Sequence, residues 1–320
     1  MRAFGISVFA LLSLAVTPAA ALDQVRLAQN QAPISGISII AKAKGFFEAN
    51  GLDVTVSNFT TGKQCLDTVV GGGADIATTA ESPTTAAAMA KTPIAFLART
   101  EYSDLKTLVA TAAEVKTPAD LRGKRIAYTA GTGSEVYTWT LLRSAKLGMS
   151  DVDLVSLRPQ EMAPALAAGS IDAYDTWEPH VINGKKALGE KVTELDTRGV
   201  YAETFNIVVM RDYADKNPKV VRAFLKSLIE AEAWMKANRE EAITTVADFV
   251  HMKRDDLALI WNEFVFGVSL DQKVMDILKA HSTWRLATGN APPNATMPDF
   301  ATVVFAAPLK DVAPDRVQLP

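Results

Sequence analysis

The sequence predicts an α/β fold made of two related units, and three observations lead to this prediction. Short apolar runs alternate with longer segments of helical periodicity, which is typical of βαβ units with a mostly parallel sheet. The length of 320 residues corresponds to about two domains at roughly 150 residues each. A short phrase also occurs twice after an expected helix, as Gly73-Ala74-Asp75-Ile76 and as Gly169-Ser170-Ile171-Asp172.

The first unit is expected to alternate strands and helices from residue 24 to about residue 90. Gly51 stands where a C-cap glycine ends a helix, and Ser82-Pro83 places a preferred N-cap residue before a proline at the first helical position. The expected strands are Gln24–Ala28, Leu52–Val56 and Ala74–Thr78. The expected helices begin near Ile34, at Gly62 (ending at Val70) and at Ser82.

The second unit repeats this plan, and the chain after it is expected to be almost wholly helical. Thr117-Pro118 again pairs an N-cap residue with a proline, and Gly131-Thr132-Gly133-Ser134 opens a helix that extends to about Lys146. Further strands are expected at Arg125–Thr129, Val152–Leu157, Ile171–Asp175 and Phe205–Met210. Further helices are expected at Glu161–Ala168, Val220–Met235, Ala242–Val250, Asp256–Phe266 and Gln272–Ala280.

No Gly/Ser-rich or Pro-rich linker separates the two units. We therefore expect short strands to join them, near residues 101–109 and 200–205. Two crossings make a hinge, with residues 22–105 and 205–320 in lobe one and residues 106–204 in lobe two.

The N-terminus predicts export. Arg2 precedes an apolar stretch from Ala3 to Val16, and Pro18-Ala19-Ala20-Ala21 supplies small residues before a cleavage point, as in a secretory signal peptide. About 14 apolar residues are too few to span a bilayer comfortably. Loss of residues 1–21 removes only Arg2 among the charged residues, so the formal charge changes from −3 to −4. An exported chain with one cysteine, Cys65, and so no internal disulfide indicates a bacterial periplasm.

The same composition excludes some functions. There is no basic excess, so nucleic acid is not an expected partner. No Gly-x-Ser-x-Gly motif is present, and Cys65 falls inside an expected helix, where it is more typical of a packing residue than of a nucleophile. With three histidines and one cysteine, neither a metal site nor a bound cofactor is expected.

A ligand site is expected beyond the carboxyl ends of the strands, where open α/β sheets bind small molecules. Glu81, Asp175, Glu178 and Glu203 all fall at such ends, where carboxylates could hold an ammonium group or N–H donors, although some could instead cap helices. Trp177 could form an apolar wall or pack in the core. The ligand-binding candidates are Gln31, Gln64, Glu81, Ser82, Tyr102, Thr132, Gly133, Ser134, Asp175, Trp177, Glu178, Glu203 and Phe205.

Four further segments carry a family resemblance. They are Ala43-Lys44-Gly45-Phe46-Phe47 with Gly51-Leu52-Asp53-Val54, then Gly73-Ala74-Asp75-Ile76, then Asp120-Leu121-Arg122-Gly123-Lys124-Arg125-Ile126-Ala127, and finally Ala168-Gly169-Ser170-Ile171-Asp172-Ala173 running into Trp177-Glu178-Pro179-His180. In this order and spacing, the sequence resembles the periplasmic solute-binding proteins of the nitrate/sulfonate/taurine class of ABC importers.

The resemblance implies a two-lobe periplasmic-binding-protein fold of type II, with the C-terminal helices on lobe one. It also implies a monomer that captures a small polar organic solute between the lobes and delivers it to an inner-membrane permease. Taurine- or sulfonate-binding relatives often carry Gly-Ser-Ser-Pro where this chain has Ala80-Glu81-Ser82-Pro83. If Glu81 faced the cleft, it would repel a bare anion such as nitrate by roughly 4 kcal/mol at about 4 Å. A zwitterion, an amine or a neutral nitrogen heterocycle would then fit better. The expected solute class as a whole is a zwitterion, an amine, a nitrogen heterocycle or a sulfonate.

Two alternatives stay open at this stage. The first is an enzyme on the same fold that resembles the pyrimidine-synthesising proteins of thiamine biosynthesis, although their cysteine-rich motif is absent here. The second is a ligand-binding adaptor for a sensory receptor, which the sequence does not distinguish from a transport component.

Overall fold

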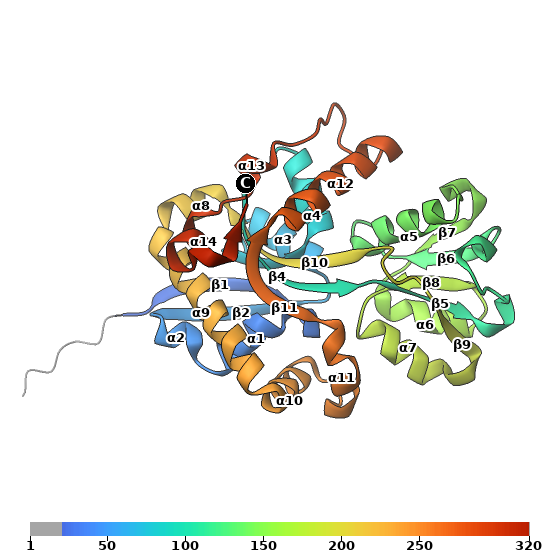
Figure 1. Cartoon of the computed structure of the whole chain (residues 1–320), viewed down its shortest axis with the longest axis horizontal. Coiled ribbons are helices and arrows are strands. Elements are labelled where there is room, and N and C mark those ends of the chain that lie inside the picture. Colours follow the sequence, from blue (N-terminus) through green and yellow to red (C-terminus); the bar gives the residue numbers. More distant parts are fainter. Residues whose placement is uncertain (1–20, 320) are drawn as a thin grey trace, which may run out of the picture.

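The computed structural model describes residues 21–319, which form two β-sheets covered by helices (Figure 1). The predicted signal peptide, residues 1–21, lies outside the described residues except for Ala21. Within the described range, no helix combines the length and the apolar character needed to cross a membrane.

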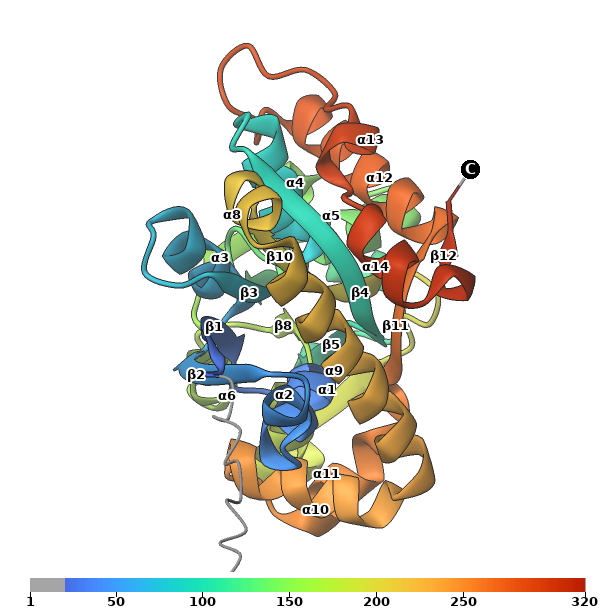
Figure 2. The same ribbon diagram turned by 90° about the vertical axis from the view of Figure 1, so that its left-hand side faces the viewer.

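The larger lobe is built on a seven-stranded sheet with the order β12-β11-β4-β10-β3-β1-β2. Its strands are β1 (Asp23–Asn30), β2 (Leu52–Phe59), β3 (Ile76–Ala80), β4 (Ile94–Asp104), β10 (Ala202–Met210), β11 (Val265–Asp271) and β12 (Val317–Gln318). Its helices are α1 (Gly36–Ala43), α2 (Phe46–Ala49), α3 (Gly62–Val70), α4 (Glu81–Met89), α8 (Arg211–Lys216), α9 (Pro218–Ala237), α10 (Arg239–Val250), α11 (Arg254–Ile260), α12 (Gln272–Thr288), α13 (Phe300–Val303) and α14 (Ala307–Val312). Helices α10 and α11 lie on one side of this lobe, and α12 and α13 lie on the opposite side (Figure 2).

The smaller lobe is built on a five-stranded sheet with the order β7-β6-β8-β5-β9. Its strands are β5 (Lys106–Ala110), β6 (Arg125–Tyr128), β7 (Asp153–Ser156), β8 (Ala173–Thr176) and β9 (Val192–Leu195). Its helices are α5 (Gly133–Ser144), α6 (Pro159–Ala167) and α7 (His180–Leu188). The two lobes have separate hydrophobic cores, because the buried clusters on the two faces of this sheet draw almost wholly on residues 105–195.

The chain passes between the lobes twice. Strand β4 ends at Asp104 and β5 begins at Lys106, so a single residue, Leu105, separates the two sheets at the first crossing. The return leads through residues 196–201 into β10, which lies beside β4 over its whole length (Figure 1). We propose a lobe border at residues 105/106, at the first crossing. For the second border we propose residues 201/202, where β10 of the larger sheet begins, instead of 204/205 within that strand.

The expectation of mostly parallel sheets is wrong. Strands β1, β2 and β3 pair in parallel, as do β6, β7 and β8, but β10 is antiparallel to both β3 and β4, and β5 is antiparallel to both β8 and β9. The antiparallel strands β4, β5 and β10 flank the crossings. Strand β4 leads the chain out of the larger sheet, β5 leads it into the smaller sheet, and β10 leads it back into the larger one.

The C-terminal part is also less helical than expected. The helix expected over Asp256–Phe266 ends at Ile260, and Val265–Asp271 forms strand β11 against β4. Side chains along β11 alternate in burial near its end, where Val268 and Leu270 face the core. Helix α7 and strand β9 were not predicted either: the apolar run of α7 is interrupted by Lys185 and Lys186, and β9 has only four residues, with Thr193 and Glu194 between its apolar ends.

The repeated phrase corresponds to a repeated contact. In the larger lobe the Asp75 carboxylate accepts bonds from the backbone N–H and the guanidinium of Arg26, and in the smaller lobe Asp172 accepts the same bonds from Arg125. Each aspartate follows a helix and fixes the start of the neighbouring parallel strand. The two lobes therefore share this arginine–aspartate contact as well as the order of their parallel strands, which supports the expectation of related units.

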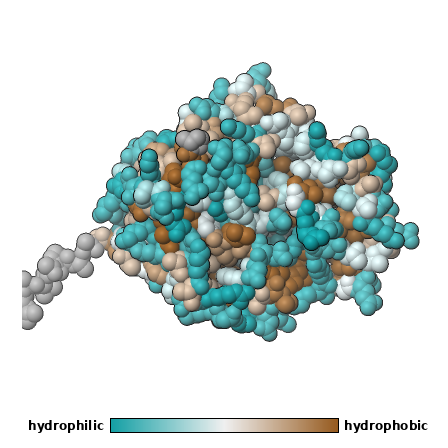
Figure 3. Space-filling view, viewed as in Figure 1, coloured by the Kyte–Doolittle hydropathy of each residue, from teal (hydrophilic) through white to brown (hydrophobic). Residues whose placement is uncertain are grey.

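The outer surface gives no sign of one dominant apolar patch on the face shown in Figure 3. Hydrophobic residues form separate groups among hydrophilic ones there. The informative features of the molecule lie between the lobes.

Candidate functional site

A small cavity lies between the lobes, where the carboxyl ends of the parallel strands meet. Its volume is about 20 Å³, close to the space that one buried water needs. It is lined by Asn30, Ile34, Thr61, Gly62, Lys63, Ala80, Pro83, Thr132, Trp177, Glu203 and Phe205. Both lobes contribute, since Thr132 and Trp177 belong to the smaller lobe and the other residues to the larger one.

Polar contacts between the lobes surround this cavity. Lys106 Nζ lies 3.1 Å from Glu263 Oε2, and the amide of Asn290 donates to Glu135 Oε1 over 3.2 Å. Lys186 on α7 also pairs with Asp256 on α11. The lobes therefore lie close together, and any solute larger than a water needs them to move apart before it can enter.

Three helix N-termini form much of the cavity wall. Helix α4 begins at Glu81 directly after β3, whereas α3 and α5 begin at Gly62 and Gly133, a few residues after β2 and β6. The first-turn N–H groups and the positive end of each helix dipole are suited to an anion or to acceptor oxygens. Lys63 adds a positive side chain at the start of α3, and a Cβ built on Gly131 of the smaller lobe would lie 3.3 Å from its Cδ atom.

Glu203 is the only carboxylate among the cavity-lining residues. It stands on β10 beside the second crossing and is 4 % exposed. A Cβ at Gly133 would lie 2.6 Å from Glu203 Oε1, so only glycine allows this approach of α5 to the carboxylate. None of the described residues hydrogen-bonds to it.

The surroundings of Glu203 disfavour its negative charge. Burial, followed by the charge of Glu81, raises its pKa well above the ordinary value for a glutamate. Glu101 on β4 is fully buried beside it, and burial together with Glu203 likewise raises the pKa of Glu101. A cationic group in the cavity would reverse this effect by stabilising the ionised carboxylate.

Glu81 does not line the cavity, contrary to the expectation that it faces the ligand. Its Oε2 accepts bonds from the backbone N–H of Thr204 over 2.6 Å and from the Thr204 hydroxyl over 2.9 Å. Its Oε1 accepts a bond from the Tyr201 hydroxyl, whose oxygen also lies 2.9 Å from His281 Nε2. The carboxylate is thus saturated within the larger lobe, and burial is the main reason that its pKa is raised.

Two other expected carboxylates are also engaged in the interior. Asp175 is fully buried, accepts the hydroxyls of Thr107 and Thr138 over 2.6 and 2.5 Å, and has its pKa raised to about 7 by burial. Glu178 accepts the backbone N–H of Ile182 in the first turn of α7, which is the helix-capping alternative considered above.

The remaining expected residues divide between the cavity and its surroundings. Thr132, Trp177, Glu203 and Phe205 line the cavity, and Gly133 touches Glu203. Ser82 and Ser134 are fully buried and engaged: Ser82 accepts a bond from Arg285, and Ser134 donates to the Asp175 carbonyl.

Gln31, Gln64 and Tyr102 point away from the cavity. The amide of Gln31 reaches the Phe249 carbonyl, Gln64 completes a capping box with Thr61, and the Tyr102 hydroxyl donates to Asp271. Ser82 is not the N-cap of α4 either, because Ala80 occupies that position.

Sequence reasoning missed seven lining residues: Asn30, Ile34, Thr61, Gly62, Lys63, Ala80 and Pro83. Each stands at or beside a strand end or helix start that the sequence predicted. Thr61 was identifiable as an N-cap residue before a helix ending in Val70, with Gln64 three positions later.

The described residues offer little for metal or nucleophilic chemistry. They contain no group of three or more His, Cys, Asp or Glu side chains placed to hold a metal ion. Cys65 is buried in α3, and burial raises the pKa of its thiol to about 12. Burial lowers the pKa of His180 to about 4, so this histidine is neutral at physiological pH.

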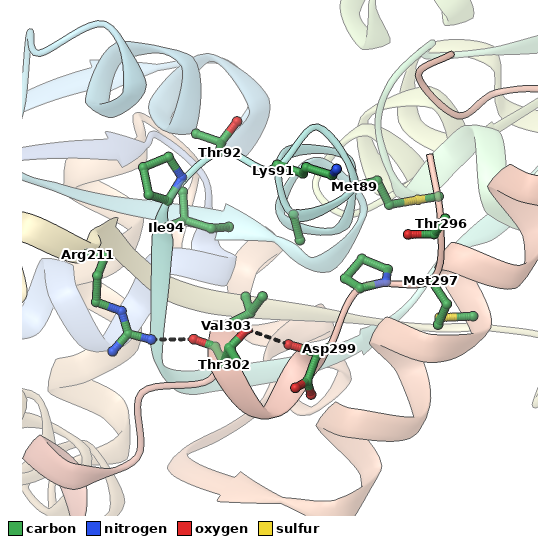
Figure 4. A pocket seen from close by; sticks show the side chains of 13 residues that line it. Met89, Lys91, Thr92, Ile94, Arg211, Thr296, Met297, Asp299, Thr302 and Val303 are labelled. Atoms are coloured by element: carbon green, nitrogen blue, oxygen red, sulfur yellow. Dashed lines mark hydrogen bonds between the residues drawn. The ribbon is translucent and has the colours of Figure 1, made fainter. Parts of the chain in front are cut away.

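A second hollow on the larger lobe lies away from the cleft, between the end of α4 and the segment before α13 (Figure 4). Its Arg211 guanidinium donates to the Thr302 carbonyl. Because one lobe forms the whole hollow, it has no relation to lobe closure.

Comparison with known proteins decides the family. The NMT1/THI5-like family matches residues 33–242. This chain belongs to that family. The matched segment starts after β1 and runs through the smaller lobe into α10, so it includes ten of the eleven cavity-lining residues.

Curated relatives of this NMT1/THI5-like protein are binding proteins. It is 27 % identical over 218 residues to a putative aliphatic sulfonates-binding protein of Escherichia coli, covering 65 % of this chain and 66 % of the relative. It is 30 % identical over 190 residues to the taurine-binding periplasmic protein of the same organism, covering 58 % and 59 %. The chain therefore matches less than two thirds of the length of each of these relatives.

Solved structures confirm the two-lobe fold. The alkanesulfonate-binding protein SsuA from Xanthomonas axonopodis pv. citri, bound to MOPS, aligns with a TM-score of 0.77 at 22 % identity over 90 % of this chain and all of that one. The desulfurization enzyme DSZB aligns with a TM-score of 0.67 at 15 % identity over 92 % and 99 %. The fold is thus shared by binding proteins and at least one enzyme, and function must be argued from the site.

Proposed function

We propose that this protein is the periplasmic solute-binding component of an ABC importer, closing its two lobes over a small zwitterionic organic solute. The observation that carries the proposal is the cavity between the lobes. Its lining combines the N-terminus of α3 and Lys63 with the buried carboxylate of Glu203, which accepts no hydrogen bond from the residues that the structure describes. The aliphatic sulfonate- and taurine-binding relatives support this choice of solute class.

The two ends of the solute meet different walls. Its acidic group, a sulfonate or carboxylate, binds the N–H groups at the start of α3, with Lys63 nearby. Its ammonium group binds Glu203, and a charge-assisted hydrogen bond of this kind contributes about 1.5–3 kcal/mol. Trp177 and Phe205 cover the short apolar part between them.

Lobe closure follows from the position of these groups. Thr132 and Trp177 come from the smaller lobe, whereas Lys63, Glu203 and Phe205 come from the larger one, so the full set of contacts exists only when the lobes are together. A solute that binds this arrangement better than the open one shifts the equilibrium towards closure. The permease then recognises the closed form, and the protein acts as an exported monomer that needs no cofactor.

Binding without turnover is favoured over catalysis on this fold. The only cysteine is buried with a raised thiol pKa, and neither Asp175 nor Glu178 has a carboxylate facing the cavity. Glu203 is the only acidic residue of the cavity lining, so the cavity has no pair of carboxylates for acid–base catalysis.

The test is a thermal-shift and calorimetric screen of the protein purified after export. The screen contains taurine as the zwitterion, ethanesulfonate and nitrate as bare anions, ethylamine as the amine and hydantoin as the heterocycle. At equal concentration, we expect taurine-like zwitterions to stabilise the fold most. A solute present at one hundred times its dissociation constant stabilises the fold by about 2.7 kcal/mol. Absence of any stabilising solute, or chemical conversion of a bound one, would contradict the proposal.

A further inference from the structure

A large cavity near the hinge lies outside the cleft. It has a volume of about 600 Å³, within the range of small-molecule sites. It is lined by Asp104, Val136, Trp139, Thr140, Gly199, Val200, Tyr201, Ala202, Lys273, Ile277, Ala280, His281 and Trp284, a set we call the hinge pocket. The solute-binding role proposed above uses none of these residues.

The hinge pocket is built from both lobes and from both crossings between them. Helix α5 of the smaller lobe supplies Val136 and Trp139, and helix α12 of the larger lobe supplies Ile277 and Trp284. Asp104 stands at the first crossing and residues 199–202 belong to the second. Figure 1 shows α12 and α5 on the same side of the molecule, above the two crossings.

A wall of interior side chains separates this pocket from the cleft. Tyr201 and His281 line the hinge pocket, and the Tyr201 hydroxyl lies between His281 Nε2 and the buried carboxylate of Glu81. Glu203 lies on the cleft side of Glu81 and lines only the cleft cavity. An occupant of the hinge pocket is therefore distinct from the solute in the cleft.

The pocket walls are aromatic and apolar. The rings of Trp139 and Trp284 meet edge to face with centroids 6.3 Å apart, one from each lobe. Val136, Val200 and Ile277 complete an apolar surface. Two ring nitrogens of the lining residues, Trp284 Nε1 and His281 Nδ1, have no hydrogen-bond partner among the described residues. Flat aromatic molecules fit walls of this kind.

Positive groups stand beside both tryptophan rings of the pocket. Lys273 lines the pocket, the Arg143 guanidinium lies 4.6 Å from the Trp139 ring centre, and the Arg285 guanidinium lies 5.3 Å from that of Trp284. Asp104 is the only acidic residue of the lining. These cations favour an anionic group placed beside the tryptophans, at the part of the pocket away from Tyr201 and the buried Glu81 bonded to it.

We propose that the hinge pocket is a second binding site, which takes a small aromatic anion such as a two-ring aromatic carboxylate. Since both lobes and both crossings form its walls, an occupant contacts a different set of atoms once the lobes rotate. Binding of this occupant therefore biases lobe closure. By linkage, the solute in the cleft changes the affinity of the hinge pocket for its occupant.

The test is isothermal titration calorimetry with 2-naphthoate on the exported protein and on two matched variants. Ala280 is exposed on α12 and lines the pocket, so Ala280→Trp fills it from the surface. Ala287 is exposed on the same helix two turns further on and does not line the pocket, so Ala287→Trp is the control. We expect 2-naphthoate to bind the wild type and the control equally, and the pocket-filling variant at least tenfold more weakly.

Charge is tested with Lys273→Gln and with a cationic probe. We expect Lys273→Gln to weaken 2-naphthoate binding about three- to tenfold, in line with the loss of one charge-assisted contact. We also expect 2-naphthylmethylamine to bind the wild type more weakly than 2-naphthoate. No 2-naphthoate binding, equal binding by both Trp variants, or a preference for the amine would overturn the proposal. None of these results depends on which solute the cleft binds.

Discussion

Two buried glutamates of the larger lobe, Glu81 at the start of α4 and Glu203 on β10, differ in their hydrogen-bond partners. Glu81 contacts β10 through Thr204, Glu203 is part of that strand, and burial raises the pKa of each. Glu81 accepts three hydrogen bonds, from Thr204 and Tyr201, whereas Glu203 accepts none from the described residues and lines the cleft.

The difference shows how burial alone fails to identify a ligand-binding group. A carboxylate whose partners are all internal stabilises the fold, and its removal leaves donors unsatisfied. A carboxylate held beside a cavity without partners destabilises the ligand-free protein and is available to a ligand. The two residues should therefore respond in opposite ways to substitution.

The largest effect is expected for Glu81→Ala, on stability. Loss of the carboxylate leaves the Thr204 N–H, the Thr204 hydroxyl and the Tyr201 hydroxyl without an acceptor in a buried setting. We expect a loss of about 3 kcal/mol in the free energy of unfolding, because each unsatisfied buried group costs about 1–3 kcal/mol. Calorimetric unfolding measures it, and a change below about 0.5 kcal/mol would remove the structural role of Glu81.

Glu203→Gln should instead leave the ligand-free protein as stable as before or more so. Because the pKa of Glu203 is raised, its contribution is most favourable at low pH and is lost as the pH rises through that pKa. We expect equal melting temperatures near pH 4 and a melting temperature a few degrees higher for the variant at pH 8. A variant that is less stable at pH 8 would mean that Glu203 has a structural partner.

The affinity for a zwitterion should depend on pH with a definite sign. An ammonium group binds the ionised form of Glu203, so binding releases a proton and the affinity rises with pH, by up to about tenfold per unit below the pKa of the free protein. Calorimetry between pH 5 and 8 measures this slope, which Glu203→Gln should flatten. An affinity that falls as the pH rises would show that protonated Glu203 donates to an anion instead.

The smallest effect is expected at Lys63. Its side chain is about half exposed and already pairs with Asp67 over 2.6 Å, so its attraction for an anionic group is screened by solvent. We expect Lys63→Gln to weaken binding about two- to fivefold, and less at high salt. Lys219→Gln, which changes a highly exposed lysine elsewhere on the larger lobe, is the control and should have no effect.

Much of the fold and the general place of the site follow from local sequence signals. Helix starts such as Thr132-Gly133 and strand ends such as Thr176 are determined by neighbouring residues, and they predicted the edge of the sheets where the cavity lies. The hidden strand β11 was missed because its neighbours in the sheet, not its own periodicity, determine its conformation.

The orientation of individual side chains could not be predicted in the same way. The pairing of β10 with β4 shifts register between Phe205 and Asn206, next to Glu203. The partners that saturate Glu81 come from residues 201–204 and from His281, more than 100 positions away. Which glutamate faces the cleft depends on these long-range contacts, which no single sequence window contains.

The central claim is that Glu203 recognises the cationic end of the solute, and one thermodynamic cycle tests it most directly. The affinities of taurine and of ethanesulfonate, which lacks the ammonium group, are measured on the wild type and on Glu203→Gln. We predict that the ammonium group increases the affinity of the wild type at least tenfold, corresponding to about 1.4 kcal/mol, and gives no gain in the variant. The same ratio of affinities in both proteins would contradict the account.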